Sequence, residues 1–131
     1  QPEIITDYGT DIFCNHPQYL PLNWHVVHSV KNSLPYIRKH ATVFKGKAGL
    51  YLVGSIGERC ITLLSDLPDD LNAELPYLQS IFGSRKRMSL TLPASMSRQI
   101  PRLEASKFYF WGEDREVALN MLVFRIPAQQ L

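Results

Sequence analysis

Two histidines, His25 and His28, stand three positions apart in a segment whose apolar spacing predicts a helix. Residues at this spacing share one face of a helix, so both imidazoles could bind a single metal ion. A protein metal site needs further ligands, and no HxxxH, CxxC or carboxylate cluster follows to supply them. The alternative is one exposed and one partly buried histidine. We therefore expect neither a metal nor any other cofactor, and His25 and His28 remain the candidate ligands.

The chain has two cysteines, Cys14 and Cys60, which could form a disulfide in an oxidising compartment. The alternative is a pair of buried thiols. A bridge would place the protein outside the cytoplasm; without it, the compartment stays unknown. Cys14 also precedes His16, but a Cys–His nucleophile needs contact in space, so we predict no catalytic residue here. Because the chain begins at Gln1 rather than Met, we expect a processed protein or a domain excised from a longer chain.

A group of basic side chains is the candidate for contacts with phosphates. It comprises Arg85, Lys86, Arg87, Arg98 and Arg102. The formal net charge is only +2, whereas a dedicated nucleic-acid binder usually has a stronger basic excess. The alternative is a solvated loop and sheet edge, where Lys and Arg prevent unwanted strand pairing. We therefore do not expect nucleic acid to be the main partner.

The last third of the chain is typical of a β-hairpin. Residues 106–111 (SKFYFW) and 117–126 (VALNMLVFRI) flank a polar break at 112–115 (GEDR). Aromatic and β-branched residues favour strands, and a short polar break with glycine favours a turn. Apolar residues occupy both alternating faces, which two helices would leave partly uncovered. We predict that the uncovered face binds a partner through Tyr109, Trp111, Leu122 and Phe124. The alternative is a sheet edge or bend that buries this face internally.

Two more strands and a helix are expected in the N-terminal part. Residues 4–5 predict one short strand and residues 11–14 another. Asn23 is the expected N-cap of a helix, and Pro35 should kink or end it near Leu34. Its apolar stripe is Val26, Val27, Val30, Leu34 and Ile37.

The middle of the chain predicts a second hairpin and a second helix. Residues 50–53 and 60–64 are the expected strands of the hairpin. Asp69 or Asp70 should cap the helix, which is expected to end at Gly83. Residues 87–92 alternate as a half-exposed strand does. The pattern Leu-Pro-Tyr-aliphatic occurs at both 34–37 and 75–78. We attribute it to chance rather than duplication, because the flanking residues do not match.

Length and composition indicate one ordinary globular domain over residues 1–131. Hydrophobic residues make up 45% of the chain and charged residues 20%. No apolar stretch approaches the roughly 18 residues of a membrane span, so none is expected. Short connections and hairpins favour an α+β fold: a mostly antiparallel sheet of four to six strands, with two helices packed on one face.

We interpret the sequence as a non-catalytic protein-interaction or sensory/regulatory domain. It would act through an apolar face or edge of the sheet, on another protein or on a second copy of itself. One alternative is a small-molecule-binding protein or small enzyme with a pocket between sheet and helices. Another is a domain that binds nucleic acid weakly. No motif in the chain is specific enough to indicate a family.

Overall fold

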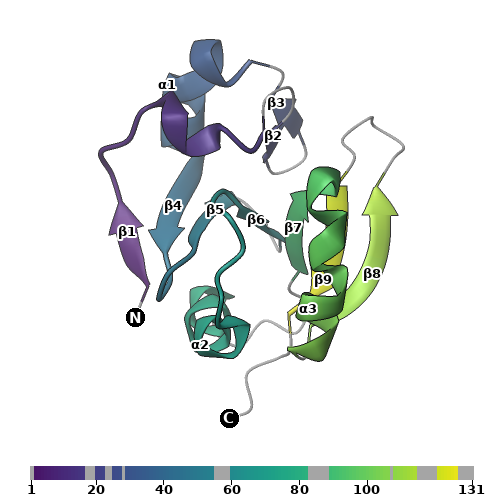
Figure 1. The fold of residues 1–131 in the computed structure, drawn as a ribbon. Helices are drawn as coiled ribbons and strands as arrows, with labels where there is room; N and C mark the ends of the chain where they lie inside the picture. Colours follow the sequence, from purple (N-terminus) through teal and green to yellow (C-terminus); the bar gives the residue numbers. More distant parts are fainter. Residues whose placement is uncertain are drawn as a thin grey trace.

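The computed structural model describes residues 2–16, 20–22, 25–27, 29–54, 60–82, 89–106, 108–114 and 121–126. Within these ranges, seven strands form one sheet in the order β1-β4-β5-β6-β7-β9-β8 (Figure 1). They are β1 (Glu3–Ile5), β4 (Ala41–Lys45), β5 (Leu50–Gly54), β6 (Cys60–Leu63), β7 (Ser89–Pro93), β8 (Tyr109–Asp114) and β9 (Met121–Arg125). A separate antiparallel pair consists of β2 (Leu20–Leu22) and β3 (His25–Val27).

Three α-helices and two 3-10 helices connect these strands. The α-helices are α1 (Val30–His40), α2 (Leu71–Phe82) and α3 (Ile100–Ala105), and the 3-10 helices are η1 (Thr10–Phe13) and η2 (Ala94–Gln99). Neighbouring strands of the large sheet are antiparallel except β6 and β7, which α2 connects in parallel. The expected α+β class with a mostly antiparallel sheet is confirmed. The sheet has seven strands rather than four to six, because the three-residue β1 joins its edge.

Two hydrophobic clusters use opposite sides of the sheet. Tyr51 belongs to the cluster that contains Leu75 of α2 and Leu103 of α3, whereas the next residue, Leu52, belongs to the cluster that contains Ile37 of α1. Adjacent residues of a strand point to opposite faces, so the two clusters lie on different faces. Two helices, α2 and α3, therefore pack on one face of the sheet, and α1 packs on the other. Figure 1 shows α1 and α2 at opposite ends of β4 and β5.

Helix α1 begins later than predicted and passes through its proline. Ser29 is the N-cap, and its side chain accepts a hydrogen bond from the backbone N of Asn32. The predicted cap, Asn23, lies outside the described residues, and β3 contains the valines that we had placed in the helix. β-Branched residues favour a strand over a helix, which explains that error. Pro35 removes one helical hydrogen bond, but it is exposed, so water can reach the free carbonyl.

The other predicted elements agree more closely with the structure. Asp70 caps α2, since its Oδ1 accepts from the backbone N of Ala73 at 3.1 Å. Strands β5 and β6 pair as the predicted hairpin, and β8 pairs with β9. Strand β8 continues through Asp114 into the expected polar break, with a register shift between Phe110 and Gly112. Residues 11–14 were expected to form a strand, but 10–13 form η1.

Candidate functional site

Two of the four residues predicted to bind a partner are part of the core. Leu122 and Phe124 are fully buried in the cluster that covers the α2 side of the sheet. Leu122 pairs in register with Leu92, and Phe124 pairs with Leu90. α2 and α3 shield this face, so these two side chains are not available to a partner. Tyr109 and Trp111 lie in β8, where the description is limited to the backbone, so their part of the prediction stays open.

The structure does not place the histidine pair on a helix, as the metal-site hypothesis required. His25 lies in β3, where residues three apart do not share a face, and His28 lies outside the described residues. In the described ranges there is no group of three or more His, Cys, Asp or Glu side chains that could hold a metal ion.

The disulfide between Cys14 and Cys60 was one of two alternatives, and in the structure Cys14 is a free, exposed cysteine that follows η1. Cys60 begins β6.

Only one of the predicted basic residues has a defined role in the structure. Arg102 donates from Nη2 to the carbonyl oxygens of Pro68 and Asp69, at 2.7 and 3.2 Å, and from Nη1 to Oε1 of Gln99 at 3.0 Å. It thus ties α3 to the segment that precedes α2. Arg98 is exposed in η2, and residues 85–87 lie outside the described ranges.

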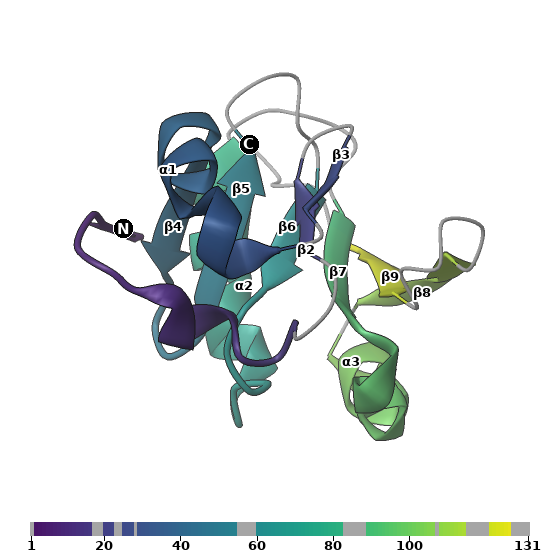
Figure 2. The ribbon, with the colours of Figure 1, turned by 90° about the horizontal axis from the view of Figure 1, so that it is seen from above.

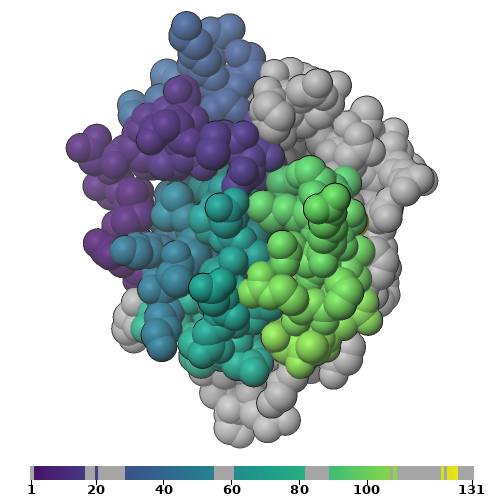
Figure 3. Space-filling view, in the orientation of Figure 1, coloured from purple at the N-terminus to yellow at the C-terminus, as the bar shows by residue number. Residues whose placement is uncertain are grey.

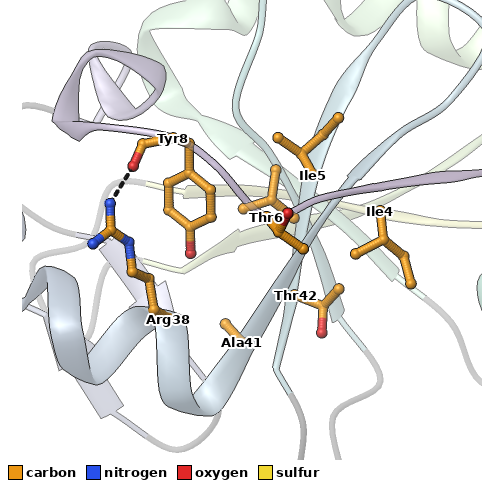
Figure 4. Close-up of a pocket in the computed structure, with 8 residues that line it drawn as sticks. Ile4, Ile5, Thr6, Tyr8, Arg38, Ala41 and Thr42 are labelled. Atoms are coloured by element: carbon orange, nitrogen blue, oxygen red, sulfur yellow. Dashed lines mark hydrogen bonds between the residues drawn. The ribbon is translucent and has the colours of Figure 1, made fainter.

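The structure contains a hollow at the edge of the sheet that sequence reasoning missed. It has a volume of about 220 Å³, and we call it the β1 hollow. Its lining is Ile4, Ile5, Thr6, Tyr8, Arg38, Ala41, Thr42 and Val43 (Figure 4). Antiparallel pairing of β1 with β4, with Ile4 opposite Phe44 and Ile5 opposite Val43, brings the N-terminal segment beside the end of α1. The hollow is therefore built by segments far apart in the sequence.

Arg38 and Tyr8 form the polar side of the β1 hollow. Nη2 of Arg38 donates a hydrogen bond to the carbonyl oxygen of Tyr8, as the dashed line in Figure 4 shows. The guanidinium carbon lies 5.4 Å from the centroid of the Tyr8 ring, within cation–π range. Phe13 supports the same ring edge-on, with centroids 5.9 Å apart. These three contacts hold the tyrosine in place, and the single hydrogen bond leaves further N–H groups on the Arg38 guanidinium.

The hydroxyl group of Tyr8 is a second polar group beside the β1 hollow. Tyr8 is 8% exposed, and among the described residues its hydroxyl makes no hydrogen bond. Burial raises the pKa of this phenol, although the positive charge of Arg38 acts to lower it, so the group stays a neutral donor. Because Tyr8 lines the β1 hollow, its hydroxyl can donate to water or to another acceptor there.

The strand that borders the hollow is an open edge of the sheet. β1 pairs with β4 on one side and ends the strand order on the other. Two large hydrophobic residues are exposed on the described surface. Ile4 in this strand is 59% exposed, and Tyr36 is 39% exposed. Figure 3 shows the N-terminal segment (purple) at the left margin of the molecule. Figure 2, seen from above, also places the N-terminus and β8 on opposite sides of the molecule.

A buried carboxylate elsewhere in the molecule is already satisfied. Glu74 of α2 accepts hydrogen bonds from the backbone N of Ala48 and of Gly49 and from the hydroxyl of Tyr51. Burial, and then the hydrogen bond to Glu74, raise the pKa of Tyr51 far above its ordinary value. These contacts use the carboxylate to hold the β4–β5 turn, so we do not assign it a ligand.

Comparisons of the chain with protein-family models, with curated proteins and with solved structures found no significant match. In the part of the chain that the structure describes, no helix has the length and apolar character needed to cross a membrane. The candidate site therefore has to be interpreted from its own geometry. A sequence signal for it did exist, because Ile4-Ile5 predicts a short strand. The pairing of that strand with β4, which builds the hollow, depends on tertiary structure.

Proposed function

We propose that this protein is a non-catalytic protein-interaction domain, and that a partner strand docks at the edge of β1. The observation that carries the proposal is the position of Ile4, an exposed isoleucine on β1, the strand that ends the described sheet beside the β1 hollow. Exposed apolar edges are usually protected, because they invite pairing with another chain. In β-strand addition, backbone hydrogen bonds supply affinity, and pockets for alternate side chains supply specificity. The β1 edge offers both elements.

A selection experiment tests this proposal without knowledge of the natural partner. The probe is a displayed library of short random segments, selected on the immobilised full chain. We expect enriched segments rich in β-branched residues that shift the amide resonances of β1 and β4 in NMR spectra. Ile4→Lys should abolish their binding, because a lysine charge at an edge strand opposes pairing. Tyr36→Lys is the matched control, since Tyr36 is an exposed apolar residue of α1 that does not line the hollow.

The proposal fails if enriched segments bind the Ile4→Lys variant as well as the original chain, or if their shifts map away from β1. It also fails if repeated selection yields no segment that depends on Ile4.

A second candidate function is the binding of a small carboxylate in the same hollow. The specific observation in its favour is that Tyr8, with its phenol hydroxyl, and Arg38, with its guanidinium, both line the hollow. Titration with glutarate, followed by NMR, tests it. Saturable shifts around Tyr8 and Arg38 at glutarate concentrations that leave the rest of the spectrum unchanged would favour this function over strand docking.

A further inference from the structure

The β1 strand carries an acidic residue that complements the hollow beside it. Glu3 is exposed at the beginning of β1, and Arg38 is exposed on α1. Among the described residues, Glu3 forms no ion pair, although Lys45 is its register partner on β4. One copy of the chain therefore displays a carboxylate on the edge strand and a guanidinium in the hollow that the same strand borders.

We propose that the strand docked at β1 is the β1 strand of a second copy of this chain; this inference rests on the proposed function. The two strands would pair antiparallel about a two-fold axis at Ile4. Ile4 then faces the second copy's Ile4, and the second copy's Glu3 lies opposite Ile5. A two-fold interface is self-complementary, so every contact is made twice.

Alternation of side chains along a strand places these groups on the correct faces. Glu3 and Ile5 share one face of β1, and Ile4 points to the other. Ile5 packs against the cluster that contains Tyr8 and Val43, on the α1 side of the sheet. The second copy's Glu3 therefore approaches on the side where Arg38 and Tyr8 line the hollow.

The second copy's Glu3 would satisfy the groups that the hollow leaves open. Its carboxylate oxygens can accept from a free N–H of Arg38 and from the hydroxyl of Tyr8, and hydrogen bonds between charged groups are the stronger kind. On the opposite face, contact between the two Ile4 side chains removes the most exposed large hydrophobic residue of the described surface from water. A docked acidic strand of another protein would satisfy only the polar groups of the hollow, Arg38 and Tyr8. The second copy also provides an apolar match for Ile4, with residues that are all present in this chain.

The strength of this association should be modest. β1 has only three residues, so the interface is much smaller than that of an obligate dimer. We expect a reversible dimer with a dissociation constant between micromolar and millimolar, detectable by sedimentation velocity over a concentration series of the full chain. Ile4→Lys should raise the dissociation constant at least about tenfold.

Exchanging the charges of Glu3 and Arg38 distinguishes a direct contact across the dimer from a structural effect of either substitution. Glu3→Arg places two cationic groups in contact at both sites of the dimer, and Arg38→Glu places two anionic groups there, so each variant alone should be monomeric. Mixed together, the two variants restore opposite charges at both sites and should form a one-to-one heterodimer. Lys39→Glu, an equal charge change at the exposed neighbour of Arg38, is the matched control and should dimerise as the original chain does. Circular dichroism confirms that each variant is folded.

Each outcome decides the proposal. Dimerisation that Ile4→Lys abolishes and the mixed variants restore supports it. A chain that stays monomeric up to millimolar concentration overturns it; the proposed function then stands if selected segments still depend on Ile4, and falls if they do not. A dimer that Ile4→Lys leaves intact, or variants that do not rescue each other on mixing, also overturn the inference. Selected acidic segments that bind a strictly monomeric chain would identify a different protein as the partner.

Discussion

The hydroxyl oxygen of Tyr51 lies 2.7 Å from Oε1 of Glu74, and each of these residues is 1% exposed. Glu74 belongs to α2 and Tyr51 to β5, so the contact joins a helix to the central sheet. The same Oε1 accepts from the backbone N of Gly49 at 2.6 Å, and Oε2 accepts from that of Ala48 at 3.0 Å. A buried carboxylate is costly to desolvate unless it is well hydrogen-bonded, and three donors satisfy this one. Glu74 thereby fixes the position of α2 against the β4–β5 turn.

Glu74→Gln should destabilise the fold more than Tyr51→Phe does. The glutamine amide would direct an NH₂ group at the backbone N–H of Ala48 or of Gly49, so that one of these donors loses its acceptor, which costs about 1–3 kcal/mol. Tyr51→Phe removes one neutral donor and leaves two N–H groups on the carboxylate, so we expect a loss of about 1 kcal/mol. Urea unfolding of the two variants and of the double variant measures both values and their coupling. Strict additivity of the two losses would contradict a direct interaction between the side chains.

Gly49 should be intolerant of a side chain. A Cβ added at this position would lie 2.7 Å from Oε1 of Glu74 and would overlap the hydroxyl of Tyr51. Both neighbours are buried and hydrogen-bonded, so neither can move without breaking the contacts described above. We expect Gly49→Ala to cost about 1–3 kcal/mol of unfolding free energy, as overpacking usually does.

Gly9→Ala is the control for this prediction. The Cβ added there meets only the side chain of Asp11, at 3.1 Å, and Asp11 is exposed and can move aside. A loss at Gly9 equal to that at Gly49 would show that glycine replacement itself, and not the contact with Glu74 and Tyr51, destabilises the chain.

Contacts between residues that are close in the sequence could be predicted from it, whereas contacts between distant segments could not. Asp70 could be identified as a helix cap because its hydrogen-bond partner, Ala73, is three residues away. The hairpins could be predicted because alternation and turn residues are local. Glu74 could not be predicted to hold Gly49, since nothing local links a residue of a helix to a turn on another layer. The β1 hollow was missed for the same reason. Leu122 was misassigned because an apolar strand looks the same whether a helix or a partner covers it.

The paired hydroxyls of Thr62 and Thr91 lead to a directional prediction. Their Oγ1 atoms are 3.1 Å apart across the parallel pair β6 and β7, and Oγ1 of Thr91 donates to the carbonyl oxygen of Ile61 at 3.3 Å. Thr91 has a single hydroxyl proton, so Thr62 must be the donor between the two side chains. Thr91→Val therefore orphans a buried donor, whereas Thr62→Val removes only a hydrogen bond that Thr91 accepts.

We expect Thr91→Val to cost about 1–3 kcal/mol and Thr62→Val about 1 kcal/mol. Replacement of both threonines should cost less than the sum, because two valines leave neither hydroxyl unpaired. Urea unfolding of the two single variants and the double variant measures this difference. The opposite ranking of the single variants would reverse the assigned direction of donation.

His16 should make the stability of the fold depend on pH. The residue is buried, and its Nε2 lies 2.9 Å from the carbonyl oxygen of Leu63. Burial lowers the pKa of the imidazole below its ordinary value of 6.5, and the hydrogen bond to Leu63 offsets only part of that effect. On acidification the unfolded chain therefore takes up this proton before the folded chain does. The contribution of His16 to stability is full above the unfolded pKa and is lost as the pH falls through the folded pKa.

His16→Gln tests this contribution, because a glutamine amide can still donate to the carbonyl of Leu63 but does not titrate. Unfolding free energies should be measured for both proteins above and below the ordinary histidine pKa. The original chain should lose more stability on acidification than the variant. At neutral pH and above, the difference in unfolding free energy between the two proteins should no longer change with pH. His40→Gln is the control, since His40 lies in α1 against Tyr36, with ring centroids 4.4 Å apart, and is less buried than His16. If acid lowers the stability of the His16→Gln variant as much as that of the original chain, another group carries the pH dependence.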